Sequence, residues 1–569
     1  MDGGDIAIIA NRFEALARRM ASNLVRSGHS GVLNRAKDLS CVVVSADHQL
    51  VAVADSLPAH VLSGPDLMSR ALAEAHPDPQ RGDAYLNNSP YHGCSHAADY
   101  TVIVPVFDEK DRHRFSVMVK AHQADIGNSV PTTYFANALD VYNEGALIFP
   151  STRVVRDRIL DADFARMCQL RIRSPDQWLG DFHAMLGSAR LGEAGIEKLA
   201  HEFGWDTLSL FVERWLDHGE SIMRAAIRAL PAGQAHAECY HDEMPGTPKG
   251  GVPARAVVRI DPQAEKIVID YRDNIDCMPN GLNLSEACCR SAGLIGLFNS
   301  LKGDFPKNSG TFRPIEILLR EGAAVGIPRH PASCSAATTN LADRAAAAVQ
   351  LAFAQIEGDF GMAEVGSVNP PSKGIISGVD WRNGRGMVTQ LFTGSTGGAA
   401  HAEGDGWLTN SHVGNAGMSL VDSVELVEYC HPLVITRRML RTDTEGAGTF
   451  VGAPSLETVM RVTGGEVKIV YASDCTHHPA RGVRGGHGAA AADQYLERSG
   501  HRERLPNLGQ LSLVKDDVVV SYSAGGGGYG DPSARDRNAV ARDVVDELIS
   551  PERAKAVYGF DAAQKPRKR

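Results

Sequence analysis

The sequence contains no cysteine pair at a spacing that holds a metal, because its ten cysteines are scattered over 569 residues. Even the adjacent Cys288 and Cys289 stand too close together to form a Cys-x-x-Cys motif. Scattered cysteines exclude a disulfide framework, and the missing pairs argue against a closed structural zinc site. We therefore expect a reducing, cytoplasmic compartment.

Long apolar segments and long basic segments are also missing. No run approaches the roughly 18 apolar residues that span a bilayer, and Met1–Arg19 lacks an apolar core with a cleavage site. With 58 basic and 68 acidic residues the formal charge is −10, which disfavours binding to nucleic acid. Apart from the tail Lys565–Arg569, expected to be a disordered end, basic residues do not cluster. We expect a soluble protein that binds neither membranes nor nucleic acid.

Two common catalytic signatures are missing as well. The glycine-rich segments 394–407 and 523–532 lack the lysine and the strand-to-helix context of a phosphate-binding loop. No Gly-x-Ser-x-Gly sequence provides a serine nucleophile. Close backbone packing or bulges explain these glycines more simply. A reaction that uses ATP would therefore need a partner chain.

The composition that remains is that of a globular protein, with 43% hydrophobic and 22% charged residues. The region 1–160 combines an amphipathic helix at Asp5–Arg26 with strand hairpins. The region 161–357 is helix-rich with inserted strands, and the region 358–569 is glycine-rich and mainly strand. We expect an α+β fold, a large multi-layer body of mixed and antiparallel sheets covered by helices, divided into these three regions.

The densest chemistry surrounds one predicted hairpin, in which two strand patterns are each flanked by a His-x-x-Asp sequence. The flanking residues are His96, Asp99, His122 and Asp125. With the turn centred after Lys110, antiparallel pairing places Asp99 opposite His122, and likewise His96 opposite Asp125. Imidazoles and carboxylates suit a divalent first-row metal such as Zn, Mn or Fe. The alternative is that these residues only cap strand ends.

Other residues are weaker candidates. Asp38 stands at the open end of an expected hairpin over 37–54, either as a further carboxylate ligand or as a turn residue. His60 follows this hairpin and adds one more imidazole. Glu144 follows a loop after Asp125 and is either a general acid or base or a surface acid. Cys475-Thr476-His477-His478 looks metal-binding, but no partner cluster lies nearby in the sequence, so we expect no metal there.

Six segments, in the same order, resemble the hydantoinase B/oxoprolinase family. They are NSPYHGCSHAADYTVIVPVF, AHQADIGNSVPTT, NEGALIFP, RSPDQWLGDFHAM, LRTDTEGAGTFVG and SAGGGGYGDPSARD. The resemblance extends from about Ile6 to Tyr558. The family includes the B subunits of ATP-dependent hydantoinases and lactamases, 5-oxoprolinase and the alpha subunit of acetone carboxylase.

The resemblance implies a divalent metal at an interface with a partner subunit of the hydantoinase A type. That partner is an actin-like ATPase, which would use ATP and Mg to phosphorylate the carbonyl oxygen of the substrate. Carried over to this sequence, the implied metal ligands are His96, Asp99, His122 and Asp38. Asp125 would then orient an imidazole from outside the ligand set. The implied assembly is a hetero-oligomer.

The resemblance leaves two reactions open. In the first, an ATP-dependent amidohydrolase opens a small cyclic amide; metal-bound water completes ring opening, while Asp125 or Glu144 moves protons. In the second, a ketone carboxylase of the acetone or acetophenone type uses the metal to hold an enolate oxygen. Departures from the usual family residues at Ser89, Gly93–Ser95 and Gln123 favour the carboxylase, whereas the chain length favours the hydrolase. A third alternative is a scaffold subunit whose metal only braces the hairpin.

Overall fold

The computed structural model describes residues 1–366, 369–415 and 419–561, so the basic tail at 565–569 lies outside the described residues. The chain forms two compact units, each assembled from segments that are distant in the sequence. Unit 1 comprises Met1–Gly233, Arg259–Ala292 and Gly303–Thr338, and unit 2 comprises Gln234–Val258, Gly293–Lys302 and Thr339–Arg569. The three regions expected from composition follow one another along the chain, whereas the units interleave.

The expected α+β class is confirmed. The elements of unit 1 are α1 (Gly3–Ser27), α2 (Gly31–Asn34), β1 (Leu39–Ser45), β2 (Leu50–Val53), α3 (Pro58–Val61), α4 (Pro65–Ala75), β3 (Ala84–Asn87), β4 (Asp99–Phe107), β5 (His113–His122), α5 (Val141–Glu144), β6 (Thr152–Arg156), β7 (Ile159–Leu160), α6 (Ala162–Arg171), α7 (Pro175–Phe203), α8 (Trp205–Arg228), β10 (Lys266–Asp270), α10 (Ser309–Phe312) and β11 (Ile315–Leu318). β10 and β11 pair in parallel. Among the described residues, no helix has both the length and the apolar character that a membrane span requires.

The elements of unit 2 are β8 (Gly233–His241), α11 (Asn340–Phe353), β12 (Ile375–Asp380), β13 (Arg385–Gln390), α12 (Val424–Cys430), β14 (Leu433–Leu440), β15 (Leu456–Val462), β16 (Glu466–Ala472), β17 (Asp493–Arg498), β18 (His501–Arg504), β19 (Leu508–Val514), β20 (Val518–Tyr522), α13 (Arg537–Val545) and α14 (Pro551–Tyr558), with short 3-10 turns at Pro371–Lys373, Val413–Asn415 and Pro532–Ala534. β8, whose first residue Gly233 belongs to unit 1, contains residues of both units, as do β9 (Val252–Asp261) and α9 (Glu286–Ser300).

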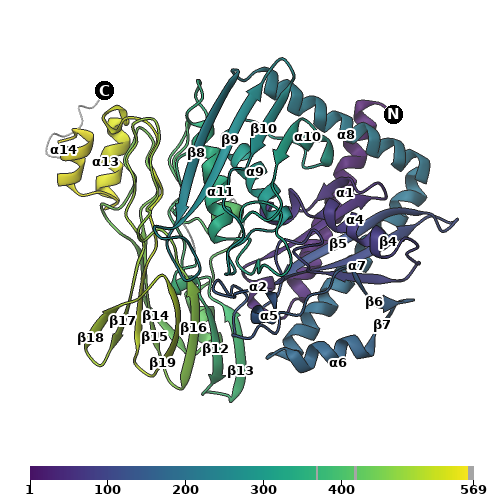
Figure 1. Ribbon diagram of the computed structural model, residues 1–569, viewed down its shortest axis with the longest axis horizontal. Coiled ribbons are helices and arrows are strands. Elements are labelled where there is room, and N and C mark those ends of the chain that lie inside the picture. The colour runs from purple at the N-terminus through teal and green to yellow at the C-terminus, as the bar shows by residue number, and fades with distance from the viewer. Residues whose placement is uncertain (367–368, 416–418, 562–569) are drawn as a thin grey trace. The chain divides into compact units, whose positions relative to one another are not determined.

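An antiparallel sheet of order β2-β1-β5-β4-β3-β6-β7 forms the centre of unit 1 (Figure 1). The strands β1, β2, β3 and β4 are buried on both faces, so their residues alternate between two apolar cores. α1 and α7 pack on one face, where Val43 and Val117 join Phe13 in the larger core. α3 and α4 pack against β1 on the other face, where Val42 and Met118 join a second core. The even-numbered residues of β1 and β5 therefore face α3 and α4.

The register of the β4–β5 hairpin confirms the predicted pairing of Asp99 with His122. A bulge between Val106 and Phe107 shifts the pairing only close to the turn. β1 joins the other side of β5 with Leu39 opposite Ala121. Asp38 precedes Leu39, and its carbonyl accepts the backbone N–H of His122 (3.1 Å). The same end of three neighbouring strands thus carries Asp38, His122 and Asp99, and all three side chains lie on one face of the sheet.

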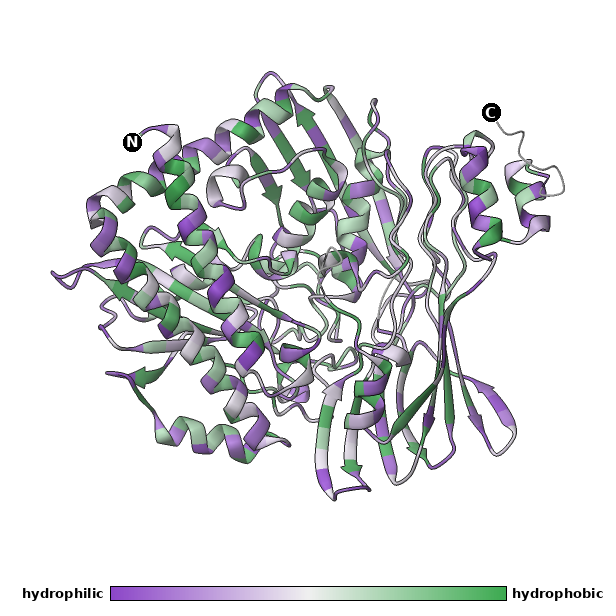
Figure 2. Ribbon diagram, turned by 180° about the vertical axis from the view of Figure 1, so that it is seen from behind, coloured by the Kyte–Doolittle hydropathy of each residue, from purple (hydrophilic) through white to green (hydrophobic). Residues whose placement is uncertain are grey.

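Unit 2 contains two antiparallel sheets, of order β13-β12-β16-β19 and β14-β15-β20-β17-β18. Their facing sides share one apolar core, to which Ile376, Ile469, Met460 and Val519 contribute. In Figure 2 hydrophobic and hydrophilic residues alternate along these strands and along the long helices of unit 1, as expected for elements with one buried side.

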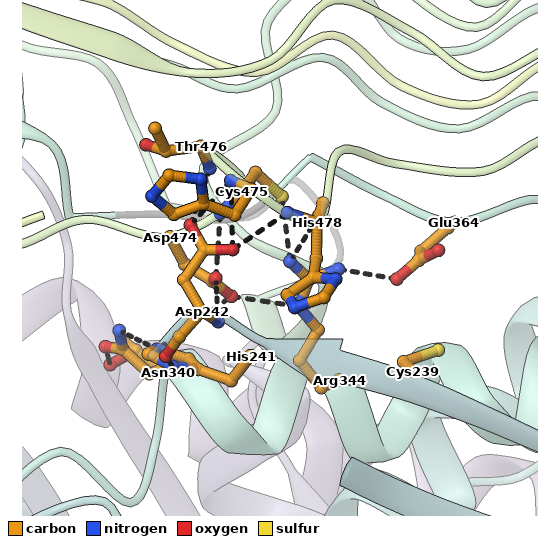
Figure 3. Close-up of polar contacts among 12 residues, drawn as sticks. Cys239, His241, Asp242, Asn340, Arg344, Glu364, Asp474, Cys475, Thr476 and His478 are labelled. Atoms are coloured by element: carbon orange, nitrogen blue, oxygen red, sulfur yellow. Dashed lines mark hydrogen bonds and ion pairs between the residues drawn. The ribbon is translucent and has the colours of Figure 1, made fainter. Parts of the chain in front are cut away.

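A buried ion cluster centred on Arg344 of α11 joins distant segments of unit 2 (Figure 3). The Arg344 guanidinium is 1% exposed; it pairs with Asp474 (2.9 Å) and with Glu364, and it donates to Cys475 Sγ (3.1 Å). Three groups thus share one cation, and burial without such partners would be costly.

The glycine-rich segments of unit 2 lie backbone against backbone, which confirms the packing interpretation. Gly526 donates its N–H to the carbonyl of Ala453 (2.9 Å) and accepts the N–H of Gly446 (3.1 Å). A methyl group added at Gly526 would overlap the carbonyl oxygen of Gly398. Glycine is needed here because two chains approach closer than any side chain permits.

We expect Gly526→Ala to destabilise the protein by about 1–3 kcal/mol, because the added methyl group must push a hydrogen-bonded backbone aside. Gly386→Ala in β13 is the matched control, since a methyl group there meets nothing within 4 Å, and it should change stability by less than about 0.5 kcal/mol. Thermal and urea unfolding measure both values. Equal midpoints for the two variants would contradict the packing argument.

Candidate metal centre

The end of the β4–β5 hairpin brings together the buried side chains of His96, Asp99 and His122. Asp99 Oδ1 lies 3.1 Å from His96 Nε2 and 3.1 Å from His122 Nδ1, and these two nitrogens lie 3.3 Å apart. One ligand atom from each residue falls within 4.8 Å of the others. Lone pairs that face one another at this distance fit a shared cation or proton.

The far side of each imidazole is held by the protein. His96 Nδ1 donates to the carbonyl of Ser335 (2.8 Å), which leaves Nε2 of the neutral ring free to bind a cation. His122 Nε2 lies 3.1 Å from the hydroxyl of Thr133. The Tyr134 ring stacks on both imidazoles at centroid distances of 5.4 and 5.2 Å. Such outer contacts fix the tautomer and the direction of imidazoles that bind metals.

Asp38 and His60 complete the cluster on the side of the other Asp99 oxygen. His60 Nε2, from α3, lies 3.1 Å from Asp99 Oδ2 and 3.6 Å from Asp38 Oδ1. His60 Nδ1 lies 3.2 Å from the hydroxyl of Ser40. Within the described parts of the chain, Asp38 Oδ1 is buried and has no hydrogen-bond partner. A buried carboxylate oxygen of this kind fits the role of an additional ligand.

Two further side chains bring a hydroxyl and a positive charge to the cluster. Ser95 donates its hydroxyl proton to Asp99 Oδ2 and accepts from Lys120 Nζ (3.2 Å). Lys120 is 3% exposed and lies on the same face of β5 as His122. Its charge offsets part of the negative charge of the two buried carboxylates.

The electrostatics favour an ionised Asp99. Burial alone raises the pKa of this carboxyl, but the imidazoles of His60 and His96 outweigh burial and hold the pKa well below its usual range. Burial lowers the pKa of His96, and the Asp99 carboxylate outweighs it, so the pKa of His96 is raised. Asp99 is therefore a charged oxygen donor at neutral pH.

Asp125 is bound away from the imidazoles, which corrects the expectation that it faces His96 and orients a ring. Its carboxylate accepts from the Arg173 side chain (2.9 Å), from the Arg173 backbone N–H (2.6 Å) and from the Gly127 N–H (3.1 Å). The carbonyl of Ser335 occupies the position next to His96 instead. Charge pairing with Arg173 suits Asp125 to anchoring the loop rather than to moving protons.

Glu144 is buried at the end of α5, which excludes the surface-acid interpretation. Its Oε2 accepts from the hydroxyl of Ser333 (2.6 Å). Burial raises the pKa of the Glu144 carboxyl, and the hydroxyls of Ser333 and Ser335 oppose part of this rise.

Cys475-Thr476-His477-His478 binds protein groups rather than forming a cluster of ligands (Figure 3). The backbone N–H groups of Thr476 and His478 donate to the Asp242 carboxylate at 2.6 and 2.8 Å. His478 Nε2 lies 2.8 Å from the carbonyl of Gly250. These contacts connect the segment to Asp242 and to the loop that contains Gly250.

From the sequence, His60 was a further imidazole without an assigned role. Three other residues were not predicted to belong to the site: Ser95, Lys120 and Ser335. Lys120 left a usable signal, because a lysine two residues before His122 in an apolar strand must lie on the same face. The short helix that carries His60 and the carbonyl of Ser335 gave no comparable signal.

We expect analysis for zinc, manganese and iron to find about one metal ion per full-length chain, lost in His96→Ala and in His122→Ala, because each variant removes one of the three converging donors. His113→Ala is the matched control: it lies on β5 like His122 but at the opposite end, beside Ser116. Retention of metal in both test variants would show that the metal binds at other residues.

A second expectation concerns His60. His60→Ala should raise the Kd for zinc about 10–100-fold without abolishing binding, because His60 holds both carboxylates in place. Competition with a chromophoric chelator measures the change, again with His113→Ala as control. A Kd equal to that of the unaltered chain would show that the carboxylates need no such support.

Comparisons with known proteins identify the family and the fold of the chain. The family model hydantoinase B/oxoprolinase matches residues 2–532. The chain is 25% identical to caprolactamase subunit beta of Pseudomonas jessenii, covering 97% of this chain and 95% of that protein.

Two solved structures share the fold. The ATP-dependent caprolactamase of Pseudomonas jessenii matches with a TM-score of 0.89 at 23% identity, over 99% of this chain and 98% of that chain. Nucleotide-free acetone carboxylase matches with a TM-score of 0.87 at 17% identity, over 97% of this chain and 79% of that chain. From the family match over nearly its whole length, the chain belongs to the hydantoinase B/oxoprolinase family.

Proposed function

We propose that this chain is the metal-binding subunit of an ATP-dependent amidohydrolase that opens a small cyclic amide. The observation that carries the proposal is the buried convergence of His96, Asp99 and His122, whose donor atoms face one another. The likeness to a caprolactamase subunit over nearly the full length of both chains supports this substrate class. The proposed partner is an ATPase subunit of the hydantoinase A type.

The residues present fit a divalent first-row cation such as Zn, Mn or Fe. His96 Nε2, His122 Nδ1 and Asp99 Oδ1 would hold it, with Asp38 as a further oxygen donor. When bound, such an ion polarises a carbonyl or phosphoryl oxygen or lowers the pKa of a bound water. The cluster is almost closed to bulk solvent, which strengthens every charge interaction within it.

ATP is needed because nitrogen resonance makes an amide carbon a poor electrophile. The partner would transfer a phosphoryl group from ATP to the amide oxygen, which removes that resonance and releases ADP. Attack of water on the carbon, cleavage of the carbon–nitrogen bond and loss of phosphate would then give the ring-opened amino acid. This chain carries no phosphate-binding loop of its own, so we assign ATP and Mg to the partner. Asp125, paired with Arg173, would keep the loop after β5 in place beside the reacting groups.

Ketone carboxylation is the alternative, because acetone carboxylase has the same fold. Fold alone does not choose between the two reactions. The matched lengths favour the hydrolase, since the structural match covers 98% of the caprolactamase chain but 79% of the acetone carboxylase chain.

The test is to copurify the chain with an ATPase subunit of the hydantoinase A type and to supply lactams of several ring sizes, hydantoin and 5-oxoproline. We expect a cyclic amide to stimulate ADP release, with ring-opened acid formed in equal amount by mass spectrometry. Parallel reactions contain acetone or acetophenone with labelled bicarbonate. Label in a ketone product would replace the hydrolase by the carboxylase. Full turnover in His96→Ala and His122→Ala would reduce this chain to a scaffold.

A further inference from the structure

The orientation of His96 depends on a segment more than two hundred residues away in the sequence. The carbonyl of Ser335 accepts from His96 Nδ1 (2.8 Å). The hydroxyl of the same serine accepts from the backbone N–H of Phe135 (2.9 Å). Any displacement of this segment would therefore turn the imidazole away from Asp99.

The Ser333 hydroxyl fixes the Cys334–Ser335 peptide, which directly precedes this carbonyl in the chain. It accepts from the backbone N–H of Ser335 (3.3 Å) and donates to Glu144 Oε2 (2.6 Å). Ser333 and Ser335 are at most 1% exposed, so water does not compete for these bonds. The carbonyl of Ser333 also accepts from the side chain of Asn283 (3.0 Å).

α5 holds Glu144 in position and contacts the same segment at a second point. The N–H of Val141 donates to the carbonyl of Pro331 (3.0 Å). Asp140 caps α5 through the N–H of Asn143 (2.8 Å), and the carbonyl of Glu144 accepts from the N–H of Ser129 (2.8 Å). Glu144 is thus anchored by its backbone while its carboxyl group reaches the serine.

We propose that Glu144 is a positioning residue for His96 rather than a proton-transfer group. Through Ser333 it fixes the segment Pro331–Ser335, and through the Ser335 carbonyl it aims His96 Nε2 at Asp99. The chain of contacts runs from a carboxylate through a hydroxyl and a peptide to a donor of the candidate metal centre. This inference rests on the proposed metal site.

The substitutions separate positioning from acid–base chemistry. Glu144→Gln keeps an oxygen that accepts from Ser333 but cannot exchange a proton as a carboxyl does, whereas Glu144→Ala removes the contact. Ser333→Ala removes the donor, and Ser333→Thr restores a hydroxyl. Glu193→Ala is the matched control, because Glu193 is a buried glutamate (3% exposed) paired with Arg190 on α7.

Zinc affinity is measured by chelator competition, and kcat and KM are measured in the copurified complex. We expect Glu144→Ala and Ser333→Ala each to raise the Kd for zinc about 10–100-fold. The double variant should be little worse than either single one, because both break the same connection. Glu144→Gln, Ser333→Thr and Glu193→Ala should retain the zinc affinity and kcat of the unaltered chain.

Two outcomes would overturn the proposal. Loss of kcat in Glu144→Gln with unchanged zinc affinity would assign proton transfer to Glu144. Unchanged zinc affinity in Glu144→Ala would show that Glu144 does not position His96.

Hydrogen–deuterium exchange of the peptide that contains Ser335 tests the same connection without metal. Exchange should accelerate in Glu144→Ala and in Ser333→Ala but not in Glu193→Ala; unchanged exchange would overturn the proposal. If the unaltered chain bound none of zinc, manganese and iron while exchange behaved as expected, the proposed metal function would fail and the Glu144 connection would stand.

Discussion

The candidate site depends on the register of one antiparallel ladder. β1, β5 and β4 lie side by side. The pairs Leu39–Ala121 and Asp99–His122 place the side chains of Asp38, Asp99 and His122 on one face, at the same end of these strands. Side chains alternate along a strand, so a slip of one residue would send His122 into the core under α1 and α7. Apolar cores on both faces hold the register, and the site follows from it.

The negative charge at this end of the strands must be compensated, because buried carboxylates are stable only with partners. His60, Ser95 and Lys120 provide those partners around Asp99.

Unit 2 is held together by different interactions. Its glycine-rich segments pack backbone to backbone, and the buried carboxylates of Glu364 and Asp474 both pair with Arg344. The same fold occurs in a caprolactamase and in acetone carboxylase. Reaction type must therefore be decided by side chains at the site, not by the scaffold that both proteins share.

The sequence by itself determined what is local: the helix at the start of the chain, the two hairpins, the pairing of Asp99 with His122 and the structural use of glycine. Strand alternation and turn position specify these, because both are read from neighbouring residues. Tertiary structure alone decided the surroundings of the site. His96 contacts Ser335, 239 residues further on, and Glu144 contacts Ser333 across 189 residues. The pairing of Asp125 with Arg173 is likewise a contact between residues that are distant in the sequence. Such contacts arise when packed elements meet, and no local pattern encodes which side chains will face each other there.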